Sequence, residues 1–495
     1  MQLLLQLKNF TEQNKTIVNN IFITIVMVLF IILTSIGVYY HEPWFDEAQA
    51  WLIAKDLNFW ELLKYMKYEG HTFIWYLVLM PFAKLNFQYP LPMSILNLVF
   101  AWSAAFIVLK KFPLMPIIKC LIIFSMPLAY QYAVIARPYA IGLVFLFALA
   151  ALYKKRLERP ILYSLLITLC ANTSSMALCG AIAFGAIFLY DYFSQKKPFF
   201  KTKEFYIIIG IVLFCITILD FQMIGADKQS AINATEYLYT TKNNLDFFFS
   251  SLQEGLFYYT ADYRIATFVL PIIFFIVSIC AFWKDKRTLF FMYFTYTVLS
   301  IIFLKFYNGY QWHHYFYFIY LIISIWIFDK KKSNIWYHGL LGLFIFSLSM
   351  AQILTYNAYR DEIKEEYTKS KSIAEYIIAN DKLKHSNLVF CDELSASIIP
   401  YLRDSGIKTY DCNTQKDASF FNRKINRGVY LNSNRLKPEI FDKFTDKDTY
   451  IVFHHGRYNR MKNPYYNLEL EYCTALGEDF QQYCITKITN RKNNE

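Results

Sequence analysis

Long apolar runs recur along most of this chain, and they limit what it can fold into. A helix needs about 20 mainly apolar residues to cross a bilayer, and several runs approach that length. The series is Ile17–Val38, Leu91–Leu109, Leu114–Tyr130, Ala140–Tyr153, Ile161–Leu178, Ala181–Tyr190, Phe205–Met223, Thr267–Trp283, Leu289–Phe306, Phe316–Phe328 and Trp336–Leu354. It predicts an α-helical polytopic membrane protein with about eleven spans. The shorter run Thr72–Leu85 is interrupted by Pro81 and is expected to lie along the membrane surface.

The composition agrees with a membrane protein. Hydrophobic residues make up 56% of the chain and charged residues 18%, whereas a soluble domain has roughly 45–50% and about 25%. The first apolar run lacks a small-residue cleavage site, so it is expected to be a retained helix rather than a signal peptide. The sequence contains no zinc-ligand spacing, P-loop or Gly-rich dinucleotide motif.

Basic residues concentrate in every second loop between the apolar runs. They are Lys110, Lys111, Lys154, Lys155, Arg156, Arg159, Lys196, Lys197, Lys201, Lys203, Lys284, Lys286, Arg287, Lys330, Lys331 and Lys332, and Lys119 lies just inside the run that follows the first of these loops. Cytoplasmic loops carry such an excess, so these loops and the N-terminus are expected inside the cell. The first outward loop, 39–90, and the tail are then expected outside the cell (inner) membrane. The net charge of +12 therefore indicates membrane orientation and no nucleic-acid partner.

The polar tail, residues 355–495, is expected to form a small extracytoplasmic α/β domain next to the membrane domain of residues 1–354. Helix and strand patterns alternate along it. The expected elements are helices Glu362–Lys382 and Ser395–Arg403 and strands Asn387–Cys391, Ile407–Cys412 and Thr449–His454. Because no Pro/Gly-rich linker precedes the tail, we expect it to dock on the membrane domain.

The cysteines fall into two groups. Those in or beside apolar runs are expected to be core residues: Cys120, Cys170, Cys179, Cys215 and Cys280. Cys391, Cys412, Cys473 and Cys484 lie in the tail, where an outward location permits disulfides. Their places near strand ends and a hairpin suggest the pairs Cys391–Cys412 and Cys473–Cys484, and other connectivities stay open.

The adjacent carboxylates Asp46 and Glu47 follow the first apolar run, between Trp44 and Trp51. Tryptophan is expected there as an interface anchor, but anchoring requires no paired carboxylates. The pair could offset the dipole at a helix N-terminus. Alternatively, Asp46 acts as a base or a metal ligand, with Glu47 in support. Adjacent helical residues point roughly 100° apart, so only one of them suits that role, and Asp46 is favoured.

Two more candidate residues occur in outward loops, each with an alternative interpretation. His71 either lines a site or is a surface histidine. Arg137 stands between Tyr132 and Tyr139. Guanidinium binds phosphate oxygens bidentately, which suits Arg137 to a phosphate. Alternatively, Arg137 pairs with lipid headgroups or with a carboxylate.

The adjacent histidines His313 and His314 lie in the aromatic stretch Tyr307–Tyr315. They could bind a phosphate, a sugar or a metal, or they could belong to interfacial aromatic packing. One histidine of the pair is expected to face any site. All of these motifs fall in outward loops, and that shared location favours a functional interpretation of each.

The segment Trp44–Trp51, together with Glu69-Gly70-His71, Trp75 and Ala136-Arg137-Pro138-Tyr139, resembles the GT-C glycosyltransferases. The branch is that of the protein mannosyltransferases and the lipid A aminoarabinose transferase. The similarity covers roughly Trp44 to Tyr153. The prolines that follow the Gly-His element in that family are absent here.

The resemblance implies a GT-C-like fold and transfer of a sugar from a polyprenyl-phosphate donor to an extracytoplasmic glycan, lipid or protein. Nucleotide sugars are cytoplasmic, so an outward site needs a donor that crosses the membrane. Asp46 would be the base, supported by Glu47, and a divalent metal ion could assist. The donor phosphate and lipid would contact Arg137, Tyr132, Tyr139, His313 and His314. The substrate would contact Trp44 and His71.

Two other classes of function stay open. A lipid-linked glycan transporter or flippase would need ionisable residues within the spans. Asp220 is one of few such residues, and this scarcity favours an enzyme. The other alternative is a non-catalytic envelope assembly protein that uses the tail as a binding module.

Overall fold

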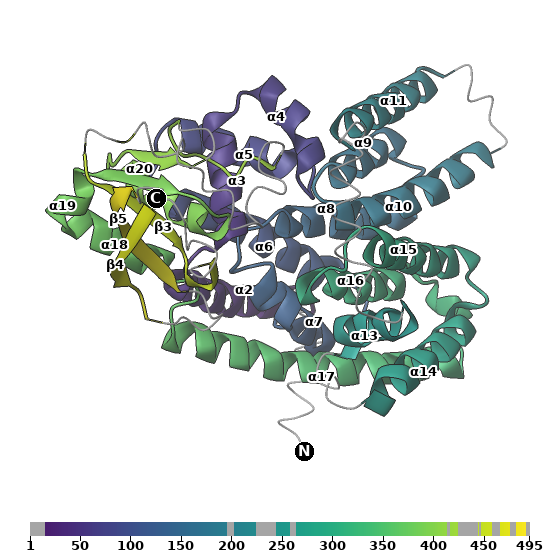
Figure 1. Cartoon of the computed structure of the whole chain (residues 1–495). Coiled ribbons are helices and arrows are strands. Elements are labelled where there is room, and N and C mark those ends of the chain that lie inside the picture. Colours follow the sequence, from purple (N-terminus) through teal and green to yellow (C-terminus); the bar gives the residue numbers. More distant parts are fainter. Residues whose placement is uncertain are drawn as a thin grey trace.

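Helices make up most of the molecule, and a small sheet follows them near the C-terminus (Figure 1). The computed structural model describes residues 15–195, 202–223, 244–257, 264–412, 416–423, 444, 447–457, 466–475 and 482–491. The helices up to residue 364 pack into a bundle, and the C-terminal domain covers one end of it.

The helical elements of the bundle follow one another with short connections. They are α2 (Lys15–Tyr40), α3 (Phe45–Asp56), α4 (Phe59–Tyr65), η1 (Met66–Tyr68), α5 (Ile74–Lys84), α6 (Leu91–Lys111), α7 (Pro116–Ile123), η2 (Met126–Gln131), α8 (Tyr139–Leu152), η3 (Tyr153–Lys155), α9 (Pro160–Ala171), α10 (Ser175–Phe193), α11 (Lys203–Met223), α13 (Asn244–Phe257), α14 (Arg264–Phe282), α15 (Lys286–Lys305), α16 (Gln311–Ile327), η6 (Lys330–Lys332) and α17 (Ile335–Lys364).

Among the described residues, 6 helices are long and apolar enough to cross a membrane: α2, α6, α10, α11, α15 and α17. The expected count of about eleven spans is not confirmed, because other apolar runs form shorter helices. The run Leu114–Tyr130 is divided into α7 and η2, with Ser125 and Pro127 at the break. The helix α9 has only 12 residues. The apolar segment at Pro81 forms the short helix α5, whose Trp75 is buried.

The expected boundary between the runs Ile161–Leu178 and Ala181–Tyr190 is wrong. The chain leaves α9 at Ala171 and enters α10 at Ser175. The Ser174 hydroxyl accepts a hydrogen bond from the backbone N–H of Ala177 at 3.1 Å. A side-chain cap of this kind satisfies a free N–H at a helix start. The second helix is therefore 19 residues long.

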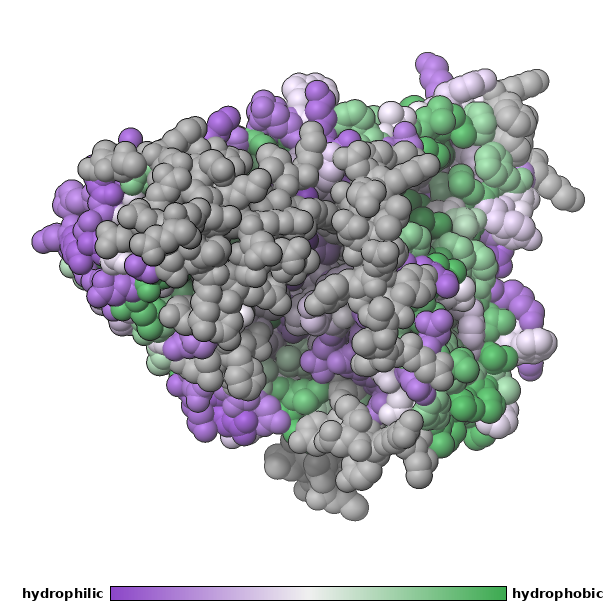
Figure 2. Space-filling view, in the orientation of Figure 1, coloured by the Kyte–Doolittle hydropathy of each residue, from purple (hydrophilic) through white to green (hydrophobic). Residues whose placement is uncertain are grey.

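Large apolar side chains face outward on the long helices. On α2, Ile17, Ile21 and Ile25 recur every four residues and are 54–57% exposed. In a water-soluble protein such a stripe would face the core. Figure 2 shows apolar surface on the side of α10 and α15 and hydrophilic surface over the C-terminal domain. These long apolar helices indicate a membrane protein.

The basic loops meet at one end of the bundle. Arg156 and Arg287 both bind the Asp191 carboxylate. The Lys332 ammonium lies 3.9 Å from Asp285, and Lys330 donates to the backbone of the loop after α6. The positively charged loops in the described part of the chain therefore share one face, as expected if they lie on one side of a membrane.

The C-terminal domain contains a 5-stranded sheet in the order β2-β1-β3-β5-β4. Its elements are α18 (Ser370–Ala379), α19 (Asp381–Lys384), β1 (Asn387–Phe390), η7 (Leu394–Ser397), α20 (Ile399–Asp404), β2 (Thr409–Asp411), β3 (Thr449–His454), η9 (His455–Arg457), β4 (Tyr466–Cys473) and β5 (Tyr483–Arg491). The strands β2, β1 and β3 run parallel, whereas β5 is antiparallel to β3 and β4. The predicted small α/β domain is thus present, and the predicted strand Thr449–His454 is confirmed.

The expected helix Glu362–Lys382 is divided. The helix α17 continues through Glu362 to Lys364, and α18 begins at Ser370. Between them Lys369 has a φ of 62°, a left-handed conformation that a continuous helix does not contain. A second difference is in the segment Ser395–Arg403, which forms η7 and α20 rather than one helix.

The two suggested disulfides have different outcomes. Cys473 and Cys484 face each other on β4 and β5 with a Cα–Cα distance of 4.1 Å and form a disulfide, as predicted. The pair Cys391–Cys412 is wrong, because both are free thiols. They follow neighbouring parallel strands and pack in one hydrophobic cluster, where the two thiols are close enough to hydrogen-bond but are not joined.

The C-terminal domain docks on the first loop of the bundle, as expected. Phe45 and Leu52 of α3 belong to the domain's own hydrophobic core. At the edge of this contact, the Arg403 guanidinium binds the Asp56 carboxylate through two nitrogens, at 2.6 and 2.9 Å. The helix α3 is therefore held between the bundle and the domain, and the predicted Asp46-Glu47 pair lies in its first turn.

Candidate active site

The start of α3 separates the two adjacent carboxylates. Glu47 turns inward and is fully buried, whereas the Asp46 side chain remains 31% exposed. This difference follows from the roughly 100° between neighbouring side chains on a helix. The two residues therefore have different surroundings, and only Asp46 is accessible to a ligand.

Glu47 joins the first turn of α3, through its side chain, to residues that are distant in the sequence. Its carboxylate accepts hydrogen bonds from the backbone N–H groups of Trp44 at 3.1 Å and Ala136 at 2.7 Å. It also lies 3.0 Å from Nε2 of His41. Because Ala136 immediately precedes Arg137, Glu47 fixes the position of that arginine relative to Asp46.

Asp46 and Arg137 form an ion pair. The Arg137 Nη1 atom donates to the Asp46 carboxylate at 2.6 Å. The guanidinium carbon lies 5.7 Å from the centre of the Trp44 ring and 5.4 Å from that of Tyr139. Cation–π contacts at these distances hold the guanidinium plane in place. The structure thus unites Trp44, Asp46, Arg137 and Tyr139, which are far apart in the sequence.

His71 belongs to the same cluster. Its Nε2 atom lies 3.3 Å from Arg137 Nη2, which can only donate, so Nε2 accepts and Nδ1 carries the hydrogen. Among the described residues, Nδ1 has no hydrogen-bond partner. Burial and the positive charges of Arg137 and Arg423 hold the pKa of His71 well below its ordinary value. His71 is therefore neutral and presents an unused N–H donor.

The adjacent histidines face different ways, as expected. His313 Nε2 lies 2.8 Å from the Tyr139 hydroxyl and so adjoins the cluster. His314 is directed elsewhere, with Nδ1 against Glu254 and Nε2 at 3.0 Å from the carbonyl of Asn308. A further candidate, Tyr132, is buried, and its hydroxyl donates to the carbonyl of Trp312 at 2.6 Å.

The C-terminal domain adds Arg423 to the site. Its guanidinium lies 3.9 Å from Asp46, 3.6 Å from Glu69 and 3.4 Å from Glu393. Arg423 is not among the residues predicted from the sequence, because no periodic pattern in its segment distinguishes it from other basic residues of the tail. Its position depends on a tertiary contact.

Gln49, one turn after Asp46, holds the Arg423 segment in place. Its side-chain amide donates to the carbonyl of Phe421 at 2.9 Å and accepts from the N–H of the same residue at 2.7 Å. It also donates to Glu69 at 3.1 Å. Burial raises the pKa of Glu69, and the Arg423 charge and the Gln49 hydrogen bond partly oppose that increase. The Glu69 carboxylate therefore holds a proton more readily than an ordinary glutamate does.

A small cavity of about 20 Å³ adjoins Asp46, Glu69, His71 and Arg137. It has room for about one water molecule. Among the described residues, no group of three or more His, Cys, Asp or Glu side chains is arranged to hold a metal ion. The cluster itself combines an accessible carboxylate, two arginines and a neutral histidine. It can accept a proton at Asp46 and bind an anion at the arginines.

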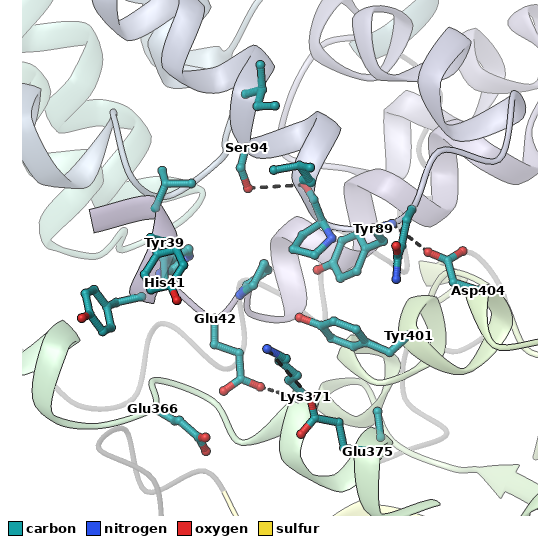
Figure 3. Close-up of a pocket in the computed structure, with 18 of the residues that line it drawn as sticks. Tyr39, His41, Glu42, Tyr89, Ser94, Glu366, Lys371, Glu375, Tyr401 and Asp404 are labelled. Atoms are coloured by element: carbon teal, nitrogen blue, oxygen red, sulfur yellow. Dashed lines mark hydrogen bonds and ion pairs between the residues drawn. The ribbon is translucent and has the colours of Figure 1, made fainter. Parts of the chain in front are cut away.

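A second cavity, of about 840 Å³, lies elsewhere, beside the ends of α2 and α6 (Figure 3). Its lining includes His41, which binds Glu47, but not Asp46 or Arg137.

No family model matches this chain, and no curated protein is similar enough in sequence to count as a match.

Proposed function

We propose that this protein is a membrane glycosyltransferase that moves a sugar from a polyprenyl-phosphate donor to an extracytoplasmic acceptor. The observation that carries this proposal is the accessible Asp46 carboxylate paired with Arg137 beside the neutral His71. A base next to anion-binding groups is what transfer of a glycosyl group from a phosphate requires. The GT-C-like motifs named above include these same residues.

In the proposed reaction, Asp46 accepts the proton of the acceptor hydroxyl. The acceptor oxygen bonds to the anomeric carbon of the sugar, and the bond from that carbon to the phosphate oxygen breaks. The electron pair leaves with the polyprenyl phosphate. Arg137 and His71 stabilise the charge on the departing phosphate by donating hydrogen bonds to it.

The ion pair between Asp46 and Arg137 has a role in this scheme. The Arg137 guanidinium binds the Asp46 carboxylate at 2.6 Å. A donor phosphate competes for that guanidinium, and its binding leaves the Asp46 carboxylate free to act as a base. The cavity of about 20 Å³ is too small for a glycosyl phosphate, so the site must widen. The contacts of Arg423 with Asp46 and Glu69 are long, at 3.9 and 3.6 Å, and therefore weak. We expect them to break first when the site widens.

The orientation is part of the proposal. We place the basic end of the bundle in the cytoplasm, following the positive-inside rule. The helix α17 starts beside the basic segment Lys330–Lys332 and ends near the C-terminal domain. The site and the domain then lie outside the cell (inner) membrane, where a lipid-linked donor is available.

The direct test uses purified protein in lipid nanodiscs. A panel of labelled polyprenyl-phosphate sugars is supplied together with envelope extracts as acceptor, and release of polyprenyl phosphate is measured. Release that depends on the wild-type protein supports the proposal. Donor binding without release from any member of the panel contradicts it and favours a transporter of lipid-linked sugars.

The orientation predicts which introduced cysteines react in intact cells. Lys384→Cys lies on the exposed surface of the C-terminal domain, and Lys154→Cys lies in an exposed basic loop. An impermeant thiol reagent should label Lys384→Cys before lysis and Lys154→Cys only after it. Labelling of the protein without an introduced cysteine measures the background from its native cysteines. The reverse pattern would overturn the orientation and, with it, the need for a lipid-linked donor.

Arg423→Gln should weaken donor binding. The variant removes a positive charge near Asp46 and Glu69 while keeping a side chain of similar length. A hydrogen bond to a charged group is worth about 1.5–3 kcal/mol, so the KM for the donor should rise roughly ten- to a hundredfold. Arg423→Lys should restore part of the lost donor affinity, and Lys384→Gln should leave the KM for the donor unchanged. An unchanged KM would mean that Arg423 only joins the domain to the bundle.

A further inference from the structure

The cavity of about 840 Å³ lies where the ends of two candidate membrane helices meet the C-terminal domain. Its size falls within the roughly 300–1,000 Å³ of typical ligand pockets. The membrane domain contributes the end of α2 and the start of α6, and the C-terminal domain contributes α18 and α20 (Figure 3).

One wall of the cavity is apolar and continues onto the outer surface of the bundle. Val38 of α2 and Leu91, Ile95 and Leu98 of α6 line it. Leu91 is 62% exposed and Ile95 is 48% exposed. On a candidate membrane helix such side chains face lipid, so the wall is accessible to an acyl chain from the bilayer.

The opposite wall carries charges of both signs. Lys371 lies in the cavity with Glu366 and Glu375. The Lys371 ammonium is 3.8 Å from the exposed Glu375 carboxylate. Glu42 also lines the cavity and accepts hydrogen bonds from backbone N–H groups of the domain, among them that of Lys369 at 3.0 Å. This wall can bind an anion at one point and a cation a few ångströms away.

We propose that this cavity binds a zwitterionic amino-phospholipid of the phosphatidylethanolamine type from the membrane. Its acyl chains lie along Leu91 and Ile95, its phosphate meets Lys371, and its ammonium meets Glu366 and Glu375. A purely anionic lipid would place its charge among several carboxylates. The site is separate from Asp46 and does not depend on the proposed reaction.

Lipid binding tests the proposal without any assay of activity. Detergent-purified full-length protein is titrated with phosphatidylethanolamine, phosphatidylglycerol or phosphatidylcholine of matched acyl chains, and bound lipid is counted by native mass spectrometry. Phosphatidylethanolamine should bind at one site per chain and at least about tenfold more tightly than the other two, because only it donates N–H groups from a cation to the carboxylates.

Variants locate the site. Ile95→Trp fills the apolar wall, and the double variant Glu366→Gln, Glu375→Gln removes the anionic partners. Each should reduce the preference for phosphatidylethanolamine about tenfold or more. Val99→Trp is one turn further along α6 and outside the cavity, and Lys384→Gln lies elsewhere on the domain, so both should keep it. Folding is checked by size-exclusion chromatography, and the double variant changes only partly or fully exposed side chains.

Three results would overturn the proposal. The first is equal binding of the lipids. The second is tighter binding of phosphatidylglycerol, which would indicate an anionic ligand instead. The third is an unchanged preference for phosphatidylethanolamine in the folded double variant Glu366→Gln, Glu375→Gln.

Discussion

Replacing Asp46 by Asn should abolish most sugar transfer while the protein stays folded. The amide keeps the shape of the side chain but cannot accept the acceptor's proton. General-base catalysis typically contributes about 10²–10⁴-fold, so kcat should fall by roughly that factor. The measurement is turnover of polyprenyl-phosphate sugar in nanodiscs, together with donor affinity. Because the uncharged amide would no longer compete with the phosphate for Arg137, donor binding should not weaken.

A matched control comes from the same loop. Glu61→Gln removes a carboxylate at the start of α4 but keeps an oxygen that can accept from the Asn58 N–H, as Glu61 does at 2.8 Å. Its activity should equal that of the wild type. If Asp46→Asn retains near-normal turnover, Asp46 is only a charge at the start of a helix and another residue is the base.

His41→Gln should strongly destabilise the protein. His41 is buried between two carboxylates, with Nε2 at 3.0 Å from Glu47 and Nδ1 at 3.0 Å from Glu362. The substitution leaves two buried carboxylates without their cation. Breaking a buried ion pair in this way costs about 3–5 kcal/mol. Thermal unfolding in detergent at neutral pH measures the loss, and His385→Gln on the exposed surface of the C-terminal domain is the control.

The His41 side chain also makes the stability of the protein depend on pH. Burial alone would lower the pKa of His41, but the charges of Glu47 and Glu362 outweigh it and raise the pKa well above 6.5. The stabilisation is therefore complete below the unfolded value of about 6.5 and is lost as pH rises through the raised folded value. The apparent melting temperature of the wild type should fall over that alkaline interval. A pH profile of His41→Gln that still matches the wild type would contradict this assignment.

The sequence predicted the helical bundle because each apolar run records local burial in a bilayer. Where the sequence prediction was wrong, the structure depends on tertiary contacts or on single residues that a hydropathy pattern does not register. Ser174 caps the start of α10 shortly after α9 ends at Ala171, inside a nearly continuous apolar stretch. The break at Lys369 has no Gly or Pro to announce it.

For the candidate site, the sequence identified residues that stand in unusual surroundings along the chain. Asp46 and Arg137 were prominent because charged side chains beside interfacial aromatics are uncommon, and the structure brings them together. Arg423 was not prominent, since a single arginine in a polar tail is ordinary. Its proximity to Asp46 arises from the hydrogen bonds between Gln49 and Phe421.

The helix α3 contributes to two cores at once. Phe45 and Leu52 pack into the core of the C-terminal domain, whereas Ala48 and Trp51 pack into that of the first loop. The tail is therefore not a detachable module. A tail produced alone would lack part of its own interior, and a chimera that exchanged only the tail would have to keep α3 with it. Evolutionary change in either part is constrained by the other through this one helix.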